Sequence, residues 1–136
     1  MTDGGFAVSG LDHLVLTVAD LDAAVGFYTR VLGMQAVAFH PSDGSQRWAL
    51  KFGRQKINLH QAGAEFEPKA KSPGPGTADL CFLSGRSVAD WVYWLDRQGI
   101  AVEDGPVRRT GAEGPILSVY LRDPDGNLIE ISNRVS

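Results

Sequence analysis

This sequence has a single cysteine, no long apolar run and no strong excess of one charge. Cys81 is the single cysteine among 136 residues, so no internal disulfide can form and a reducing cytoplasm is expected. No apolar run approaches the roughly 20 residues that cross a bilayer, and the start lacks the basic and apolar regions of a secretory signal. The formal net charge of −3 argues against a general electrostatic attraction to nucleic acid or anionic lipid.

The composition that remains is that of a globular protein. Hydrophobic residues make up 43% of the chain and charged residues 21%, which predicts a packed core. The length of 136 residues fits one domain, or two small modules that share a core.

An internal repeat indicates that the chain consists of two small modules that share a core. The segment GLDHLVL (10–16) aligns with GTADLCF (76–82), which places His13 on Asp79. The same offset places Gly33 on Gly99, and each glycine ends a helical pattern where a left-handed residue is wanted.

The pattern around these markers predicts two βαβββ modules. One helix is expected from Asp20 to Leu32 and another from Ser87, each with a capping residue at its start. Strands are expected at 35–40, 47–52, 56–61, 100–104, 116–122 and 127–132, besides those of the repeat. We therefore predict a single domain over 1–136, with modules at 9–61 and 76–133 and a Pro- and Gly-rich linker at 62–75. The segment GPVRRTGAEGP in the second module is expected to be a loop.

Alternation along the strands predicts a cluster of polar residues on the face that the helices leave uncovered. His13, His60, Asp79 and Glu130 all fall on that face, on the first or last strand of a module. Imidazole and carboxylate groups suit divalent Zn, Ni, Co, Mn or Fe, so these four residues are candidate metal ligands. Each could instead be a polar residue on a wet sheet face, and Asn58 competes with His60 for the same place.

The same alternation places cationic and aromatic groups beside this cluster. Arg47, Lys51 and Arg122 fall on the uncovered face with Tyr120, which favours a small anionic ligand, unless the long side chains simply reach solvent. Cys81 falls there too, and it is expected to be a small buried hydrophobe rather than a nucleophile.

Two motifs resemble those of a known family. The stretch LDHLVLTVADLDAAVGFYTRVLGM (11–34) resembles the opening of vicinal oxygen chelate modules, and DPDGNLIEI (123–131) resembles their closing hairpin. This superfamily contains glyoxalases, bleomycin resistance proteins and dioxygenases, and segments 52–70 and 105–133 are most similar to its glyoxalase domain-containing protein 5 group. The resemblance implies an α+β fold in which two tandem βαβββ modules form a curved mixed sheet with helices on the outer face.

The resemblance also implies a function. A divalent metal would chelate two neighbouring oxygens of a small substrate and stabilise an enolate or oxyanion. His13 and Glu130 match ligand positions, whereas Asn58 or His60 and Asp79 stand where glyoxalase I enzymes have Glu and His.

The sequence leaves several functions open. The first is a metal-dependent lyase or isomerase that acts on a small oxo-acid, with Glu130 and His60 as the catalytic groups. The others are a ring-cleaving dioxygenase and a metal-free binding protein of the bleomycin-resistance type, which would use Asn58, Arg47, Lys51, Tyr120 and Arg122. Exposed sheet edges further predict a homodimer.

Overall fold

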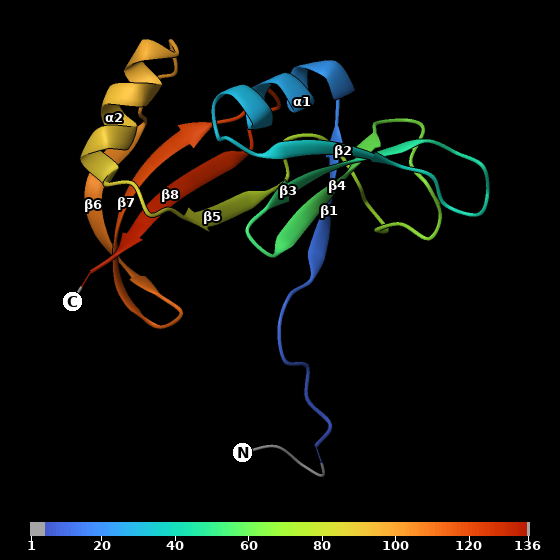
Figure 1. The fold of residues 1–136 in the computed structure, drawn as a ribbon, viewed down its shortest axis with the longest axis horizontal. Helices are drawn as coiled ribbons and strands as arrows, with labels where there is room; N and C mark the ends of the chain where they lie inside the picture. The colour runs from blue at the N-terminus through green and yellow to red at the C-terminus, as the bar shows by residue number, and fades with distance from the viewer. Residues whose placement is uncertain (1–4, 136) are drawn as a thin grey trace.

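The computed structural model describes residues 5–135 and contains two βαβββ units in tandem (Figure 1). The first consists of β1 (His13–Val18), α1 (Leu21–Arg30), β2 (Gln35–Phe39), β3 (Arg47–Phe52) and β4 (Gln55–Gln61). The second consists of β5 (Asp79–Leu83), α2 (Val88–Arg97), β6 (Asp104–Gly111), β7 (Gly114–Arg122) and β8 (Leu128–Arg134). The predicted α+β fold of two such modules is confirmed.

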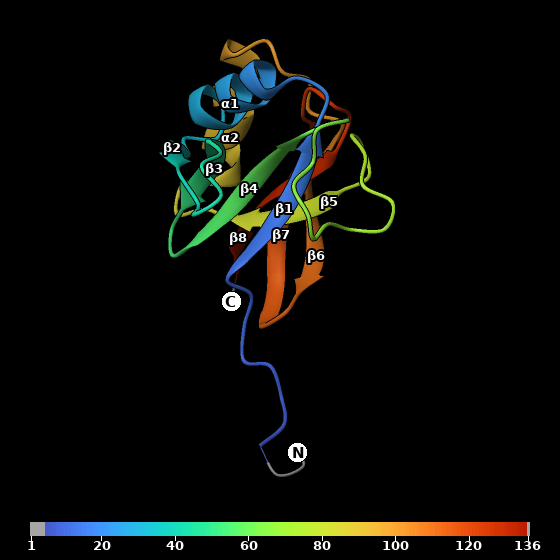
Figure 2. The same cartoon turned by 90° about the vertical axis from the view of Figure 1, so that its right-hand side faces the viewer.

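The strands form two four-stranded mixed sheets with the same topology. Their orders are β1-β4-β3-β2 and β5-β8-β7-β6, so the first and last strands of each module pair in parallel. Figure 2 shows the two sheets turned relative to each other, with both helices on the same side of the molecule. Each helix contacts its own sheet and leaves the opposite face uncovered.

Capping side chains fix where the helices begin, as the sequence predicts. Asp20 accepts a hydrogen bond from the Ala23 backbone N–H at 3.2 Å, and Ser87 accepts one from Asp90 at 3.0 Å. Gly33 and Gly99, just after the helices, both have φ of +73°, a value that side chains with a Cβ rarely adopt. The repeat seen in the sequence is thus a repeat of local geometry.

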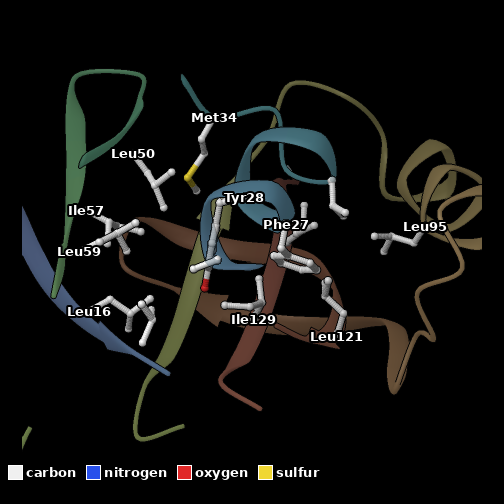
Figure 3. Packing of buried hydrophobic residues seen from close by; sticks show 14 of the residues in the cluster. Leu16, Phe27, Tyr28, Met34, Leu50, Ile57, Leu59, Leu95, Leu121 and Ile129 are labelled. Carbon is white, nitrogen blue, oxygen red and sulfur yellow. The ribbon is translucent and has the colours of Figure 1, made fainter. Parts of the chain in front are cut away.

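One core joins the two modules, and α1 lies at its centre. Figure 3 shows Phe27 and Tyr28 of α1 above Ile129 of the second sheet, with Leu16 of the first sheet in the same cluster. The Tyr28 hydroxyl, from the first module, donates a hydrogen bond of 2.6 Å to the buried carboxylate of Asp123 in the second. Burial and this bond raise the pKa of Tyr28, so the hydroxyl keeps its proton.

The segment expected to be a loop, GPVRRTGAEGP, belongs to a hairpin instead, and the strand expected at 100–104 is wrong. β6 starts at Asp104 and pairs with β7 as far as Gly111 opposite Gly114. Pro106 and the glycines suggested a loop, yet β6 is an edge strand, where a proline without an N–H is tolerated. Gly114, with φ of +134°, allows the tight turn that closes the hairpin.

Two further observations bear on the sequence expectations. Cys81 was expected to be buried but is exposed, because the sheet face on which it lies is not covered by a helix. Within residues 5–135, neither helix is long and apolar enough to cross a membrane.

Candidate functional site

The uncovered face of the first sheet holds the predicted histidines and Asn58. The parallel pairing of β1 with β4 sets His13 opposite Lys56, Val15 opposite Asn58 and Thr17 opposite His60. His13 lies at the exposed start of β1, and its Nδ1 is 2.9 Å from the Asp12 carboxylate. His13 and His60 therefore occupy opposite ends of this face.

His60 lies in a polar corner that the linker helps to close. Its ring meets the Phe66 ring edge-on at 5.5 Å, and the Arg47 guanidinium lies 3.8 Å above the same Phe66 ring. Burial, and secondarily the charge of Arg47, lower the pKa of His60, which keeps the imidazole neutral at physiological pH. A neutral imidazole can accept a proton or bind a metal.

A cavity of about 350 Å³ adjoins this corner. It lies between β1 and the linker segment 68–74, with Thr17 and His60 in its wall. Most of its lining is apolar or backbone, so it suits a small organic group. The linker, predicted as a simple connection, thus also forms one side of a cavity.

On the same face, the side chain of Asn58 has a buried oxygen, Oδ1, that accepts no hydrogen bond from the described residues. A buried acceptor without a partner is costly, so a donor from a ligand or a second chain would stabilise this position.

The uncovered face of the second sheet holds Glu130 in a network of hydroxyl groups. Ser118 donates a hydrogen bond of 2.6 Å to Glu130 Oε2, and Ser132 lies 2.6 Å from Ser118 and 3.5 Å from the same carboxylate oxygen. Both serines are fully buried, whereas Glu130 is partly exposed. The network therefore holds the carboxylate in one orientation with one side open.

Tyr120 and Arg109 complete a cavity of about 400 Å³ around Glu130. Arg109 Nε donates to the Tyr120 hydroxyl at 2.9 Å, which leaves the phenol proton free for a ligand. Partial burial raises the pKa of Tyr120, so this proton is retained. A carboxylate, a phenol and a guanidinium in one cavity can bind an anion and move a proton.

The remaining predicted residues are placed apart from these cavities or engaged elsewhere. Asp79 is exposed at the start of β5, opposite Leu128. Arg47 also pairs with Asp43 at 2.7 Å, and Arg122 forms a two-pronged pair with Glu103 at 2.8 and 2.9 Å. Lys51 is exposed on the uncovered face of the first sheet.

The four candidate metal ligands are divided between the sheets, with His13 and His60 on one and Asp79 and Glu130 on the other. Across residues 5–135, no three His, Cys, Asp or Glu side chains come together in a way that would hold a metal ion. Within one chain, these residues do not fit a common metal.

Sequence reasoning missed Ser118, Ser132 and Arg109. Both serines follow from the alternation that placed Glu130, because both lie on its face of β7 and β8. Arg109 gave no such signal, because its segment was taken for a loop.

Comparison with known proteins identifies relatives along nearly the whole chain. The family model "Glyoxalase/Bleomycin resistance protein/Dioxygenase superfamily" matches residues 10–131. The glyoxalase domain-containing protein RDO1 of Mycosarcoma maydis is 58% identical over 93% of this chain and 69% of its own length. The virulence protein STM3117 of Salmonella typhimurium is 54% identical over 94% of this chain and 86% of its own.

Solved structures agree with this relationship. An integron cassette protein from the mobile metagenome of V. cholerae superimposes with a TM-score of 0.90 at 54% identity, covering 96% of this chain and 98% of that one.

A more distant relative by sequence is an enzyme: the ethylmalonyl-CoA/methylmalonyl-CoA epimerase of Cereibacter sphaeroides is 28% identical over 91% of this chain and 97% of its own length.

Proposed function

The chain belongs to the glyoxalase/bleomycin resistance protein/dioxygenase superfamily, and from this premise we propose that it is a metal-dependent lyase or isomerase acting on a small anionic oxo-acid. The observation that carries the proposal is the Glu130 carboxylate, oriented by Ser118 and facing a cavity that also holds Tyr120 and Arg109. The name of the epimerase relative, which acts on ethylmalonyl-CoA and methylmalonyl-CoA, supports an isomerisation rather than a ring cleavage. The narrower likeness to the glyoxalase domain-containing protein 5 group stays a prediction.

Two side chains are suited to act as the base that accepts the proton. The neutral imidazole of His60 can take a proton from a carbon next to a carbonyl group, since burial favours its uncharged form. Glu130 is an alternative base, and Tyr120 can donate its free hydrogen to a substrate oxygen. Arg109, beside Tyr120, would orient the anionic group of the substrate.

A metal would need ligands from two copies of the chain. We infer a homodimer in which one copy supplies His13 or His60 and the other supplies Glu130 or Asp79. The uncovered faces also expose Val15 and Leu83, at 47% and 53%, and large exposed apolar side chains favour contact with a second chain. Such pairing would be symmetric, with two equivalent sites.

The test combines metal analysis with mixing of variants. We expect His13→Ala and Glu130→Ala each to abolish metal uptake by the purified protein, while His40→Ala, in an exposed loop, leaves it unchanged. The two variants are then unfolded together and refolded, so that half of the dimers contain one chain of each kind. Each mixed dimer has one intact site out of two, so about a quarter of the wild-type metal content should return.

The outcomes separate the hypotheses. No recovery after mixing would contradict a site shared between copies. Wild-type protein with less than about a tenth of an equivalent of any transition metal, and no uptake when metal is added, would contradict metal dependence itself.

A metal-free binding protein is the second candidate. The cavity of about 350 Å³ beneath the linker favours it, because that cavity is mostly apolar and is lined within one chain. If wild-type protein takes up no metal, its affinity for small aromatic and anionic compounds becomes the property to measure.

A further inference from the structure

The β3–β4 hairpin carries three cations that have no carboxylate partner. Lys51 and Lys56 are directly opposite each other in the antiparallel pairing, on the uncovered face, and Arg54 lies in the two-residue turn between the strands. Within residues 5–135, none of the three forms an ion pair shorter than 4 Å. Like charges directly opposite in a sheet destabilise it, so an anion between them would relieve the repulsion.

These cations surround a cavity of about 360 Å³. Its apolar lining consists of Val37, Phe39 and the buried Ala49. The Lys56 ammonium lies 4.6 Å above the Phe39 ring, which holds the charge over this apolar surface. The cavity therefore combines positive charge with space for a short hydrocarbon group.

One carboxylate lies at the same cavity and offsets only part of this charge, because three cations line it. Asp12 is hydrogen-bonded to His13 at 2.9 Å, and the charge of Lys56 also helps to lower its pKa, but it forms no ion pair within 4 Å with the three cations. Two other cations that the sequence suggested for binding an anion, Arg47 and Arg122, are each paired with a carboxylate. Lys51, Arg54 and Lys56 remain available.

We propose that this cavity is a binding site for a multiply charged anionic group, either a phosphate or a pair of carboxylates, on a small molecule with a short apolar part. Two ammonium groups and a guanidinium provide the donors that such a group requires. The site uses residues other than the candidate metal ligands, so it does not depend on the proposed reaction.

The experiment measures binding of pyrophosphate and of malonate to metal-free protein at low salt by calorimetry. The variant Lys51→Gln/Lys56→Gln should bind the preferred anion about tenfold more weakly than wild type. The control Lys71→Gln/Arg97→Gln removes the same charge from exposed positions elsewhere and should differ from wild type by less than about twofold.

Each outcome decides the matter. Binding of pyrophosphate alone identifies a phosphate site, and binding of malonate alone identifies a dicarboxylate site. Equal weakening in both variants would show a general charge effect and would overturn the proposal, as would the absence of binding to wild type. Since no metal is present, failure of this binding test leaves the metal-uptake test unaffected.

Discussion

The uncovered faces of the two modules differ in charge although their strands repeat the same topology. The strands of the first module contain no Asp or Glu, and their uncovered face carries Arg47, Lys51 and Lys56. The corresponding face of the second module holds Glu130 among hydroxyl groups, with Asp79 at its edge. The repeat thus preserves the backbone while the uncovered side chains diverge, because only the helix-facing residues are constrained by the shared core.

The buried hydrogen bond between Tyr28 of the first module and Asp123 of the second should have the largest effect when it is removed. Asp123→Ala leaves the buried Tyr28 hydroxyl and the Asn127 amide without their acceptor, so we expect unfolding to become easier by about 3 kcal/mol or more. Urea denaturation measures this loss. Asp125→Ala, which loses a bond of 3.2 Å to the Ala19 backbone, should cost less than about 1 kcal/mol. Equal losses in the two variants would show that the buried contacts of Asp123 stabilise the fold no more than the exposed contact of Asp125 does.

The hydroxyl network on the second face should have the next largest effect. Ser118→Ala removes a fully buried donor to the Glu130 carboxylate, and we expect a loss of about 1.5–3 kcal/mol in the free energy of unfolding. Ser132→Ala should cost less, because its contact with Glu130 is 3.5 Å long. The reverse order would mean that Ser132, rather than Ser118, orients the carboxylate.

The smallest effect concerns His60 on the first face. Its lowered pKa means that the folded chain binds fewer protons there than the unfolded chain does, so stability falls as the pH drops below about 6.5. The slope of the unfolding free energy against pH, measured between pH 7 and 5, gives the number of protons taken up on unfolding. His60→Gln should lower this number by less than about one. His40→Gln, at an exposed position, should keep the wild-type slope. An NMR titration midpoint for His60 above 6.5 would contradict the expected effect of burial on this imidazole.

Much of the fold could be predicted because its signals are local. Asp20 and Ser87 sit one residue before the helices they cap, and Gly33 and Gly99 follow those helices with the expected positive φ. The alternation along β1 and β8 gave the faces of His13 and Glu130 correctly, since side chains in a strand change sides at every residue. The β6–β7 hairpin escaped prediction because its proline and glycines are tolerated at a sheet edge.

The candidate site was less accessible to sequence reasoning. Alternation gives the side to which Arg47 and Arg122 point, but their carboxylate partners, Asp43 and Glu103, depend on how loops and strands meet. The division of His13 and Glu130 between two sheets likewise follows from long-range pairing, which periodicity does not encode.

The sequence by itself determined the two βαβββ modules, the ends of their helices and the direction of each strand residue, because these depend on backbone preferences and hydrophobic period over a few neighbours. Tertiary structure alone decided that Ser118 orients Glu130, that Phe66 lies against His60 and Arg47, and that Lys51 and Lys56 share a cavity in which cations outnumber carboxylates. Such contacts join residues that are distant in sequence or set by strand register, and their energy depends on the distance and burial reached only in the folded chain.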